Sequence, residues 1–373
     1  MIHQVVLKAA SRCNLNCTYC YIYNAEDQTF RSQPPQISDE VYDALLTRIA
    51  EYCQRRPGHS VALCFHGGEP TLLGVRRFSA LVKRARRALG ATLRCIAIQT
   101  NGTLIDENWA RALDDLEVVV SVSLDGPAQV HNPGRVDHRG QGSHASVIKG
   151  IQVLQRFNIP VNILCVVNPY ASGLQVYRYL RSLSIDEMDF LLPDVSHDNK
   201  DRIYSGLGPT PVADYLLPIL DDWLREDDPN VQIRIFWGLF TQLFGGKSST
   251  DGFGGNGSGY VIVETNGSIE VNDALRVCYD GVGKSGLNVL QHGFDMLDAA
   301  PEFITQLMKG SLPLPTACRD CPERSVCGGG YVPHRYSREK GFDNPSVWCS
   351  DILQILRRMR SYVKHDENCV SAN

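Results

Sequence analysis

Three cysteines lie within eight positions near the start of the chain, in "SRCNLNCTYCYIYN" (residues 11–24). Cys13, Cys17 and Cys20 follow an apolar, strand-like segment, "VVLKAA" (5–10), so the thiols are expected on the loop after that strand. Soft thiolates select iron–sulfur clusters or zinc. A structural zinc site needs four ligands, and residues 21–52 contain no further cysteine or histidine. Three thiolates on a four-iron cluster would leave one iron open to bind a substrate.

A second group of cysteines lies near the other end of the chain. The segments "ACRDCPERSVCGGGYVPHRY" and "NPSVWC" contain Cys318, Cys321, Cys327 and Cys349. CxxC with two further cysteines could hold zinc or a second iron–sulfur cluster, and the residues alone leave both possibilities open.

Short β-branched segments alternate with helical patterns over the first 200 residues, which predicts parallel βα units. The strands are expected at 5–10, 61–65, 94–100, 118–124, 159–168 and 188–192. Six such units favour an α/β fold with a barrel or partial barrel over a small open sheet, and functional groups are then expected at the carboxyl ends of the strands. The first helix is expected to begin after Ser38, which can cap it, with Val41, Leu45 and Ile49 on its buried face.

The pattern changes after residue 200. We expect a barrel over 1–200, a connector with helices over 201–259 and a cluster-binding domain over 260–373. The connector ends in "GFGGNGSG" (252–259), a formal GxGxxG that precedes a strand, so a loop is favoured over a dinucleotide site. "YVIVETNGSIEV" (260–271) predicts a hairpin with an Asn266-Gly267 turn.

Three motifs follow the cysteine loop in order, each at a predicted strand end: "HGGEP" (66–70), "QTNG" (99–102) and "SLDG" (123–126). Together with CxxxCxxC they resemble the radical SAM superfamily. The resemblance implies a partial (β/α)6 TIM-like barrel and a [4Fe–4S] cluster on Cys13, Cys17 and Cys20 that binds S-adenosylmethionine (SAM). It further implies a set of SAM-contacting residues: Tyr19, Gly67, Gly68, Glu69, Pro70, Asn101, Ser123 and Arg135.

The second cysteine group is similar to the SPASM extension of radical SAM enzymes that modify peptides and sulfatases. The usual pattern, CxxCx5CxxxC, has a cysteine where this chain has Tyr331. The departure favours one auxiliary [4Fe–4S] cluster, on Cys318, Cys321, Cys327 and Cys349, over the two that sulfatase-maturing enzymes use.

Over residues 5–352 the chain most resembles the cyclophane-forming maturases of ribosomally made peptides. That resemblance implies abstraction of a side-chain β-hydrogen from a precursor peptide, followed by a C–C bond to an aromatic ring. Ferredoxin or flavodoxin would supply electrons. Thioether formation, epimerisation and formylglycine formation in a sulfatase remain alternatives, and so does a non-catalytic scaffold that presents a peptide.

A base is needed for the proton that such an oxidation releases. The candidates lie in and after the predicted hairpin, at Glu264, Asp273 and Asp280, although solvated surface acids are common.

The formal net charge of −4 gives no basic field that would favour nucleic acid or anionic lipid as a partner. No signal peptide or long apolar segment is present, which favours a cytoplasmic location and no membrane partner. Cys53, Cys64, Cys95 and Cys165 lie in apolar segments or on a helix face, where structural roles are expected.

Overall fold

The computed structural model describes residues 1–248 and 250–370, with side chains through residue 363. The chain forms two compact units. Unit 1 contains residues 1–124, 131–164 and 257–310, and unit 2 contains residues 125–130, 165–256 and 311–373.

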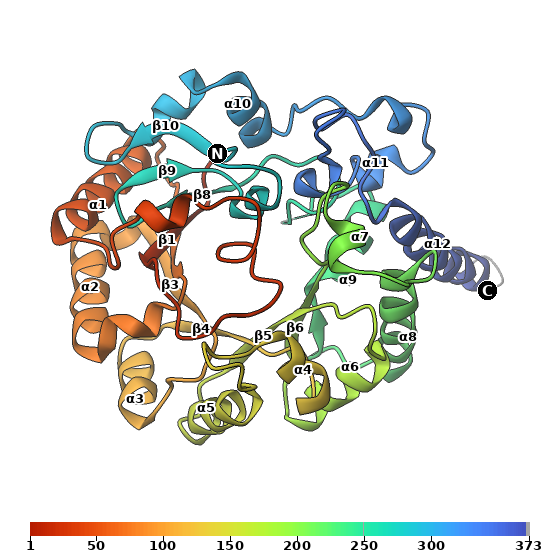
Figure 1. Ribbon diagram of the computed structural model, residues 1–373, viewed down its shortest axis with the longest axis horizontal. Coiled ribbons are helices and arrows are strands. Elements are labelled where there is room, and N and C mark those ends of the chain that lie inside the picture. The colour runs from red at the N-terminus through yellow and green to blue at the C-terminus, as the bar shows by residue number, and fades with distance from the viewer. Residues whose placement is uncertain (249, 371–373) are drawn as a thin grey trace. The chain divides into compact units, whose positions relative to one another are not determined.

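Unit 1 is built on a mixed sheet (Figure 1). Its parallel strands are β1 (Gln4–Ala10), β2 (Val61–Gly67), β3 (Leu93–Thr100), β4 (Val119–Ser123) and the first residues of β5 (Val161–Val166). On the other side of β1 lie β8 (Tyr260–Val263), parallel to it, and the antiparallel β9 (Ser268–Glu270) and β10 (Lys284–Asn288). The order is therefore β10-β9-β8-β1-β2-β3-β4-β5.

Helices of unit 1 lie outside these strands (Figure 1). They are α1 (Asp39–Gln54), α2 (Gly74–Leu89), α3 (Glu107–Asp115), α5 (His144–Arg156) and α10 (Glu302–Lys309), and α4 (Ala128–Gly134) begins in unit 2. The prediction for α1 is confirmed: the Ser38 hydroxyl accepts a hydrogen bond from the Val41 N–H at 3.2 Å, and Leu45 and Ile49 are buried.

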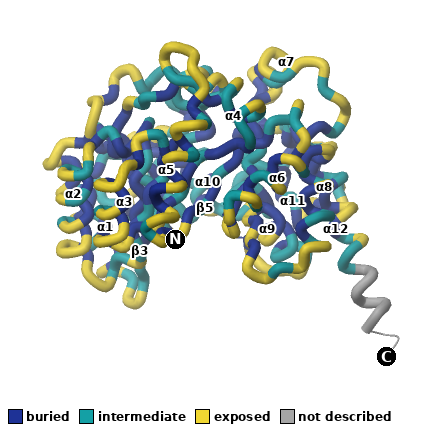
Figure 2. Tube along the Cα trace, turned by 90° about the horizontal axis from the view of Figure 1, so that it is seen from below, coloured by how far each residue is buried: buried dark blue, intermediate teal, exposed yellow. Residues whose placement is uncertain are grey.

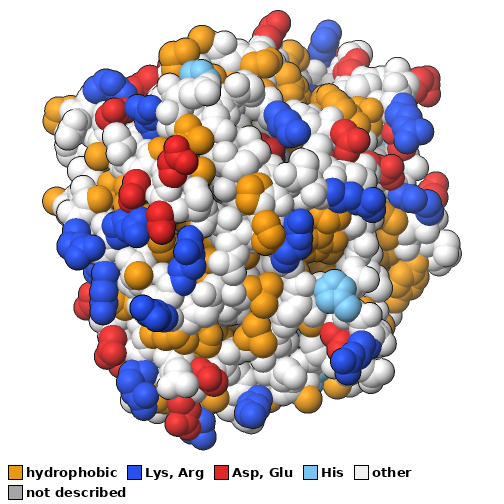
Figure 3. Space-filling model, turned by 60° about the vertical axis from the view of Figure 1, so that its left-hand side comes forward, with side chains coloured by type: hydrophobic (Ala, Val, Ile, Leu, Met, Phe, Trp, Pro, Cys, Tyr) orange, Lys and Arg blue, Asp and Glu red, His pale blue; other side chains and the backbone are white. Residues whose placement is uncertain are grey.

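Buried and exposed positions alternate along α1, α2 and α3, as amphipathic helices require (Figure 2). The arginines of α2 meet acids of α1: Arg84 lies 3.2 Å from Asp39 and 3.0 Å from Asp43. Positive and negative side chains are interspersed on this side of the molecule (Figure 3). The surface therefore carries no single-sign field there.

Unit 2 contains β6 (Glu187–Leu191), paired in parallel with β7 (Gln232–Ile233), and the C-terminal extension. Its helices are α6 (Gly173–Ser182), α7 (Lys200–Ile203), α8 (Pro211–Glu226), α9 (Arg234–Leu243), α11 (Arg324–Cys327) and α12 (Cys349–Val370). The extension is tied to α8, because Asp351 accepts the Val212 and Ala213 N–H groups at 2.7 and 2.9 Å.

The predicted α/β fold with a partial barrel and a C-terminal extension is confirmed, and every predicted strand of the first 200 residues is present. The predicted hairpin also forms, but residues 257–310 group with unit 1, and β8 pairs directly with β1. Among helices in the described ranges, none combines the length and the hydropathy that a membrane span requires.

Candidate functional site

The cysteine loop follows β1, as predicted. Cys13 Sγ accepts a hydrogen bond from the Leu15 N–H at 3.3 Å. Burial raises the pKa of Cys13 to about 12, and negative charge on Cys17 and Cys20 contributes to the rise. The Cys13 thiol therefore lies within electrostatic reach of both Cys17 and Cys20. Three soft donors on one loop fit an iron–sulfur cluster, whose cationic core would stabilise the thiolates.

Within residues 1–248 and 250–370, no three His, Cys, Asp or Glu side chains lie close enough together to hold a single metal ion.

Gly67, the last residue of β2, and the following Gly68 allow the backbone to approach the cysteine loop. A Cβ on Gly67 would lie 2.1 Å from the Ala10 carbonyl oxygen, and one on Gly68 would lie 2.3 Å from the Arg12 carbonyl oxygen. Gly67 also has a φ of +132°. The Gly68 N–H donates to the Ala10 carbonyl at 2.8 Å. The glycines of "HGGEP" thus hold the end of β2 against the start of the loop, and Pro70 begins the next turn.

We predict that Gly68→Ala strongly disturbs this contact. Overpacking costs about 1–3 kcal/mol, and here the added methyl group meets backbone that cannot move away without shifting the cysteine loop. The midpoint temperature of thermal unfolding should fall, and the affinity for SAM should decrease.

Gly208→Ala is the matched control, because a Cβ at that position has no atom within 4 Å. Equal SAM affinity in Gly68→Ala and the wild-type protein would contradict the prediction.

Glu69 is fully buried and joins the ends of two strands. Its carboxylate accepts the Thr71 N–H at 2.9 Å, the Thr100 hydroxyl at 2.7 Å and the Asn101 N–H at 2.7 Å. Burial raises the pKa of Glu69, while these donors lower it. A contact from Glu69 to the SAM ammonium group stays a prediction; in the structure, the carboxylate organises the surrounding loops.

Other predicted SAM contacts lie around the same loop. The Asn101 amide lies 2.9 Å from Asn14 Oδ1 and 3.7 Å from Cys13 Sγ. The Arg135 guanidinium stacks over the Tyr19 ring at 5.5 Å. Ser123, at the end of β4, accepts a hydrogen bond from the Gln99 amide at 3.0 Å. The structure thus brings Tyr19, Asn101 and Arg135 to the cysteine loop.

Asp273 lies next to the cysteine loop although it is 253 positions from Cys20 in the sequence. It begins a 3-10 turn (Asp273–Val277) that follows β9. Its carboxylate forms an ion pair with Lys8 of β1 and accepts the Tyr21 hydroxyl at 3.1 Å. Burial would raise the pKa of Asp273, but the positive charge of Lys8 dominates and lowers it to about 2. Asp273 is therefore an ionised carboxylate at neutral pH.

The sequence analysis did not predict a role for Lys8, although a lysine within the apolar segment "VVLKAA" indicates a buried charge that needs a partner. Its side chain is only 3% exposed. Lys8 Nζ also lies 3.5 Å from His66 Nδ1. Burial and the Lys8 charge together lower the pKa of His66 to about 4, so the imidazole is neutral.

The other two candidate bases have different surroundings. Glu264 lies in a buried ion cluster in which the Arg276 guanidinium contacts three carboxylates, of Asp27 at 3.3 Å, Glu264 at 2.8 Å and Glu270 at 2.6 Å. Asp280 is exposed and accepts the Gln28 N–H at 2.6 Å. The structure thus brings Asp273, but neither of the others, into contact with Lys8 and Tyr21.

The second cysteine group lies in unit 2, around short turns. Cys318 ends a 3-10 turn (Thr316–Cys318), Cys327 ends α11 and Cys349 begins α12. Burial raises the pKa of Cys327 to about 12, and charge on Cys349, Cys318 and Cys321 adds to the rise. All four thiols therefore lie within electrostatic reach of one another, and their chemistry fits an iron–sulfur cluster.

Three glycines with positive φ, Gly328 to Gly330, separate Cys327 from Tyr331. A Cβ on Gly328 would lie 2.0 Å from the Gly255 nitrogen, and the Gly254 N–H donates to the Cys327 carbonyl at 3.1 Å. The glycine-rich segment 252–259 is a loop, as predicted. Its first half packs on the turn that carries Cys327.

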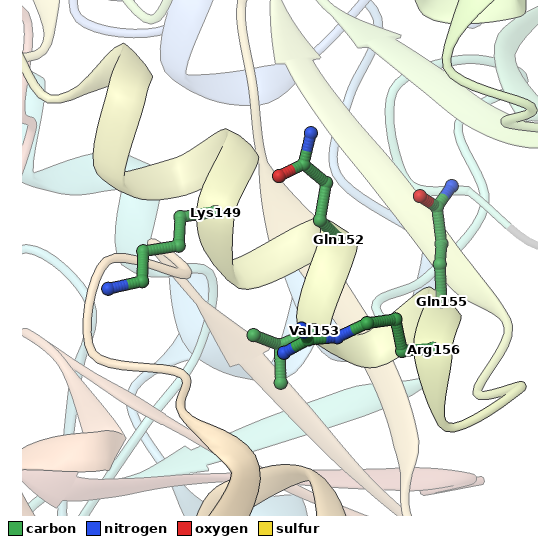
Figure 4. Close-up of a pocket in the computed structure, with 5 residues that line it drawn as sticks. All are labelled: Lys149, Gln152, Val153, Gln155 and Arg156. Atoms are coloured by element: carbon green, nitrogen blue, oxygen red, sulfur yellow. The ribbon is translucent and has the colours of Figure 1, made fainter.

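A cavity of 550 Å³ lies elsewhere, on the outer side of unit 1 (Figure 4). It is lined by residues of α5: Lys149, Gln152, Val153, Gln155 and Arg156. None of them is a predicted site residue.

Residues 7–173 match the model of the Radical SAM superfamily. The chain is 29% identical over 358 residues to the cysteine-type anaerobic sulfatase-maturating enzyme of Clostridium perfringens, with 94% of each chain covered. Among solved structures, native anSMEcpe with bound AdoMet and Cp18Cys peptide is similar at 25% identity and a TM-score of 0.82, covering 99% of each chain. SuiB of Streptococcus suis bound to the precursor peptide SuiA shares the fold at 16% identity and a TM-score of 0.62, covering 93% of this chain and 76% of that one.

The fold, the ordered motifs and these similarities support a radical SAM enzyme with a C-terminal extension like that of anSMEcpe. The anaerobic sulfatase-maturating enzymes resemble this chain more closely than SuiB does. The prediction of a radical SAM/SPASM enzyme is thus confirmed at the level of class. The comparisons do not specifically support the cyclophane-forming subgroup.

Proposed function

We propose that this enzyme removes a hydrogen atom from the β-carbon of one side chain in a peptide or protein substrate. The observation that carries the proposal is the ionised, half-buried Asp273 beside the cysteine loop, paired with the buried Lys8 and with Tyr21. The similarity to a protein solved with a bound peptide supports the class of substrate. When bound, SAM and its cluster supply the adenosyl radical that takes the hydrogen.

Asp273 is proposed to accept the proton that leaves as the substrate carbon radical is oxidised. One electron must leave as well, and Cys318, Cys321, Cys327 and Cys349 would hold the cluster that takes it. Tyr19, Asn101 and Arg135 are proposed to position SAM. Both products considered below need this same first abstraction.

Formylglycine is the product that the comparisons favour, because the chain resembles a cysteine-type anaerobic sulfatase-maturating enzyme over 94% of its length. Loss of one hydrogen atom, one electron and one proton converts a Cys side chain to a thioaldehyde. Water then replaces the sulfur, which leaves as hydrogen sulfide, and an aldehyde remains. Asp273 can take the proton in this reaction.

An intrapeptide C–C crosslink is the second candidate, and Tyr331 favours it. The SPASM pattern has a cysteine at this position, and this chain has a tyrosine after three glycines. One auxiliary cluster is then expected, which gives about eight irons per chain, against about twelve for two auxiliary clusters. In this reaction the carbon radical adds to an aromatic ring, and loss of one electron and one proton restores aromaticity.

The test uses the anaerobically reconstituted enzyme with SAM, a reductant and one of two peptides: Cp18Cys or the product of a short reading frame beside the gene. An aldehyde trapped on Cp18Cys would support formylglycine formation. Loss of two hydrogen atoms without an aldehyde, located by fragmentation between a ring and a β-carbon, would support the crosslink. Deuterium at the β-carbon should appear in deoxyadenosine in either case; deuterium transfer solely from an α-carbon would overturn the proposal.

A further inference from the structure

Arg335 is a buried cation whose charge is not balanced by a neighbouring carboxylate. The residue is only 4% exposed. Its Nη2 donates to the Pro313 carbonyl at 2.7 Å and its Nε donates to the Phe342 carbonyl at 3.1 Å. Both acceptors are neutral, and among the residues with described side chains no carboxylate lies within ion-pair distance of Arg335.

Burying a guanidinium without an anion is costly, so such a group usually has a charged partner. Arg276 shows how this chain meets that requirement elsewhere: at a similar burial it contacts three carboxylates. Arg335 lacks any comparable arrangement. The charge of Arg335 must therefore be balanced by an anion other than a paired carboxylate.

Arg335 lies among the segments that carry the second cysteine group: its acceptor Pro313 lies shortly before Cys318, and the Val347 N–H, just before Cys349, donates to the carbonyl of the adjacent His334 at 2.9 Å. The negative groups whose charge acts on Arg335 are the Cys318 thiol, the Asp343 carboxylate and the Cys327 thiol. Asp343 is exposed, so water screens its charge, and it already accepts the Thr316 N–H at 2.6 Å and the Thr316 hydroxyl at 3.0 Å. The buried anions near Arg335 are thus the cysteines of the second group once they are ionised.

We propose that Arg335 is the internal counter-ion of the auxiliary iron–sulfur cluster and raises its reduction potential. This inference rests on the proposed function, which places a cluster on Cys318, Cys321, Cys327 and Cys349. Taking up one electron adds a negative charge to a site that already carries four thiolate charges. A fixed positive charge stabilises the reduced form more than the oxidised form, because net charge is one of the factors that set cluster potentials.

The cation thereby suits the cluster to take the electron that leaves the substrate radical, while the proton goes to Asp273. The two carbonyl bonds keep the guanidinium in place and leave its charge uncompensated. Arg335 is thus a positioning and tuning residue, with no contact to substrate required.

The experiment is a redox titration of the full-length chain followed by electron paramagnetic resonance. The background is Cys13→Ala/Cys17→Ala/Cys20→Ala, which leaves the auxiliary cluster as the single signal. Arg335→Met should shift the potential to a more negative value, and Arg335→Lys, which keeps the charge, should stay near the wild-type value. Arg338→Met is the matched control, because Arg338 is exposed and three residues away, and its removal should leave the potential unchanged.

An auxiliary cluster with full iron and an unchanged potential in Arg335→Met would overturn the inference and leave the proposed cluster intact. No iron bound in the background variant would remove the proposed cluster and the inference together. If Arg335→Met cannot hold iron, Arg335→Gln and Arg335→Lys decide the question. If Arg335→Lys retains iron and Arg335→Gln loses it, the positive charge is what the cluster requires. If both variants lose iron, the inference is overturned and the role of Arg335 is structural.

Discussion

Replacing Cys13, Cys17 and Cys20 together by alanine is expected to reduce cleavage of SAM to background. Three thiolates on the loop after β1 are the ligands that fit the SAM-binding cluster, and other side chains at the loop cannot substitute as soft ligands. The measurement is deoxyadenosine formation under reducing, anaerobic conditions, with iron counted on the same samples. About four irons per chain should be lost.

Cys53→Ala is the matched control, since this thiol is buried on α1 and is expected to act as a small apolar group. It should keep its iron and cleave SAM, with a modest loss of thermal stability of about 1 kcal/mol. Deoxyadenosine formation at the wild-type rate in the triple variant would refute the central assignment.

Replacing Asp273 by asparagine is expected to separate SAM cleavage from product formation. The amide keeps the shape of the carboxylate but cannot accept the proton, so modified peptide should fall by about 10²–10⁴-fold while deoxyadenosine continues to form. Both products are measured in the same reaction. Asp280→Asn serves as the comparison, because Asp280 is exposed and bonds to the Gln28 backbone.

The same change leaves Lys8 buried without its partner, which can cost about 3–5 kcal/mol of stability. Thermal unfolding of Asp273→Asn must therefore be measured alongside the assay, and Lys8→Met provides an independent approach.

Without the Lys8 charge, burial raises the pKa of Asp273, so a larger fraction of the carboxyl group is protonated at mildly acidic pH. Product formation in Lys8→Met should decline on the acidic side at a higher pH than in the wild-type enzyme. Equal product yields in Asp273→Asn and the wild-type protein would exclude Asp273 as the base.

Local signals in the sequence determined the strands, the first helix and the places of both cysteine groups. β-Branched segments and helical periodicity act over a few residues, so the range of β1 and the Ser38 cap of α1 could be predicted without tertiary information. The spacing of Cys13, Cys17 and Cys20 likewise depends on one short loop.

The tertiary structure alone decided how distant segments meet. The pairing of β8 with β1 brings Asp273 to Lys8, 265 positions away, and distinguishes Asp273 from Glu264 and Asp280. A sequence pattern shows which face of a strand is apolar, but the choice of a neighbouring strand depends on packing over the whole unit. The same reason explains why the buried Lys8 and the carbonyl-bound Arg335 emerged only from the folded chain: burial of a charge and the identity of its partners are properties of that packing.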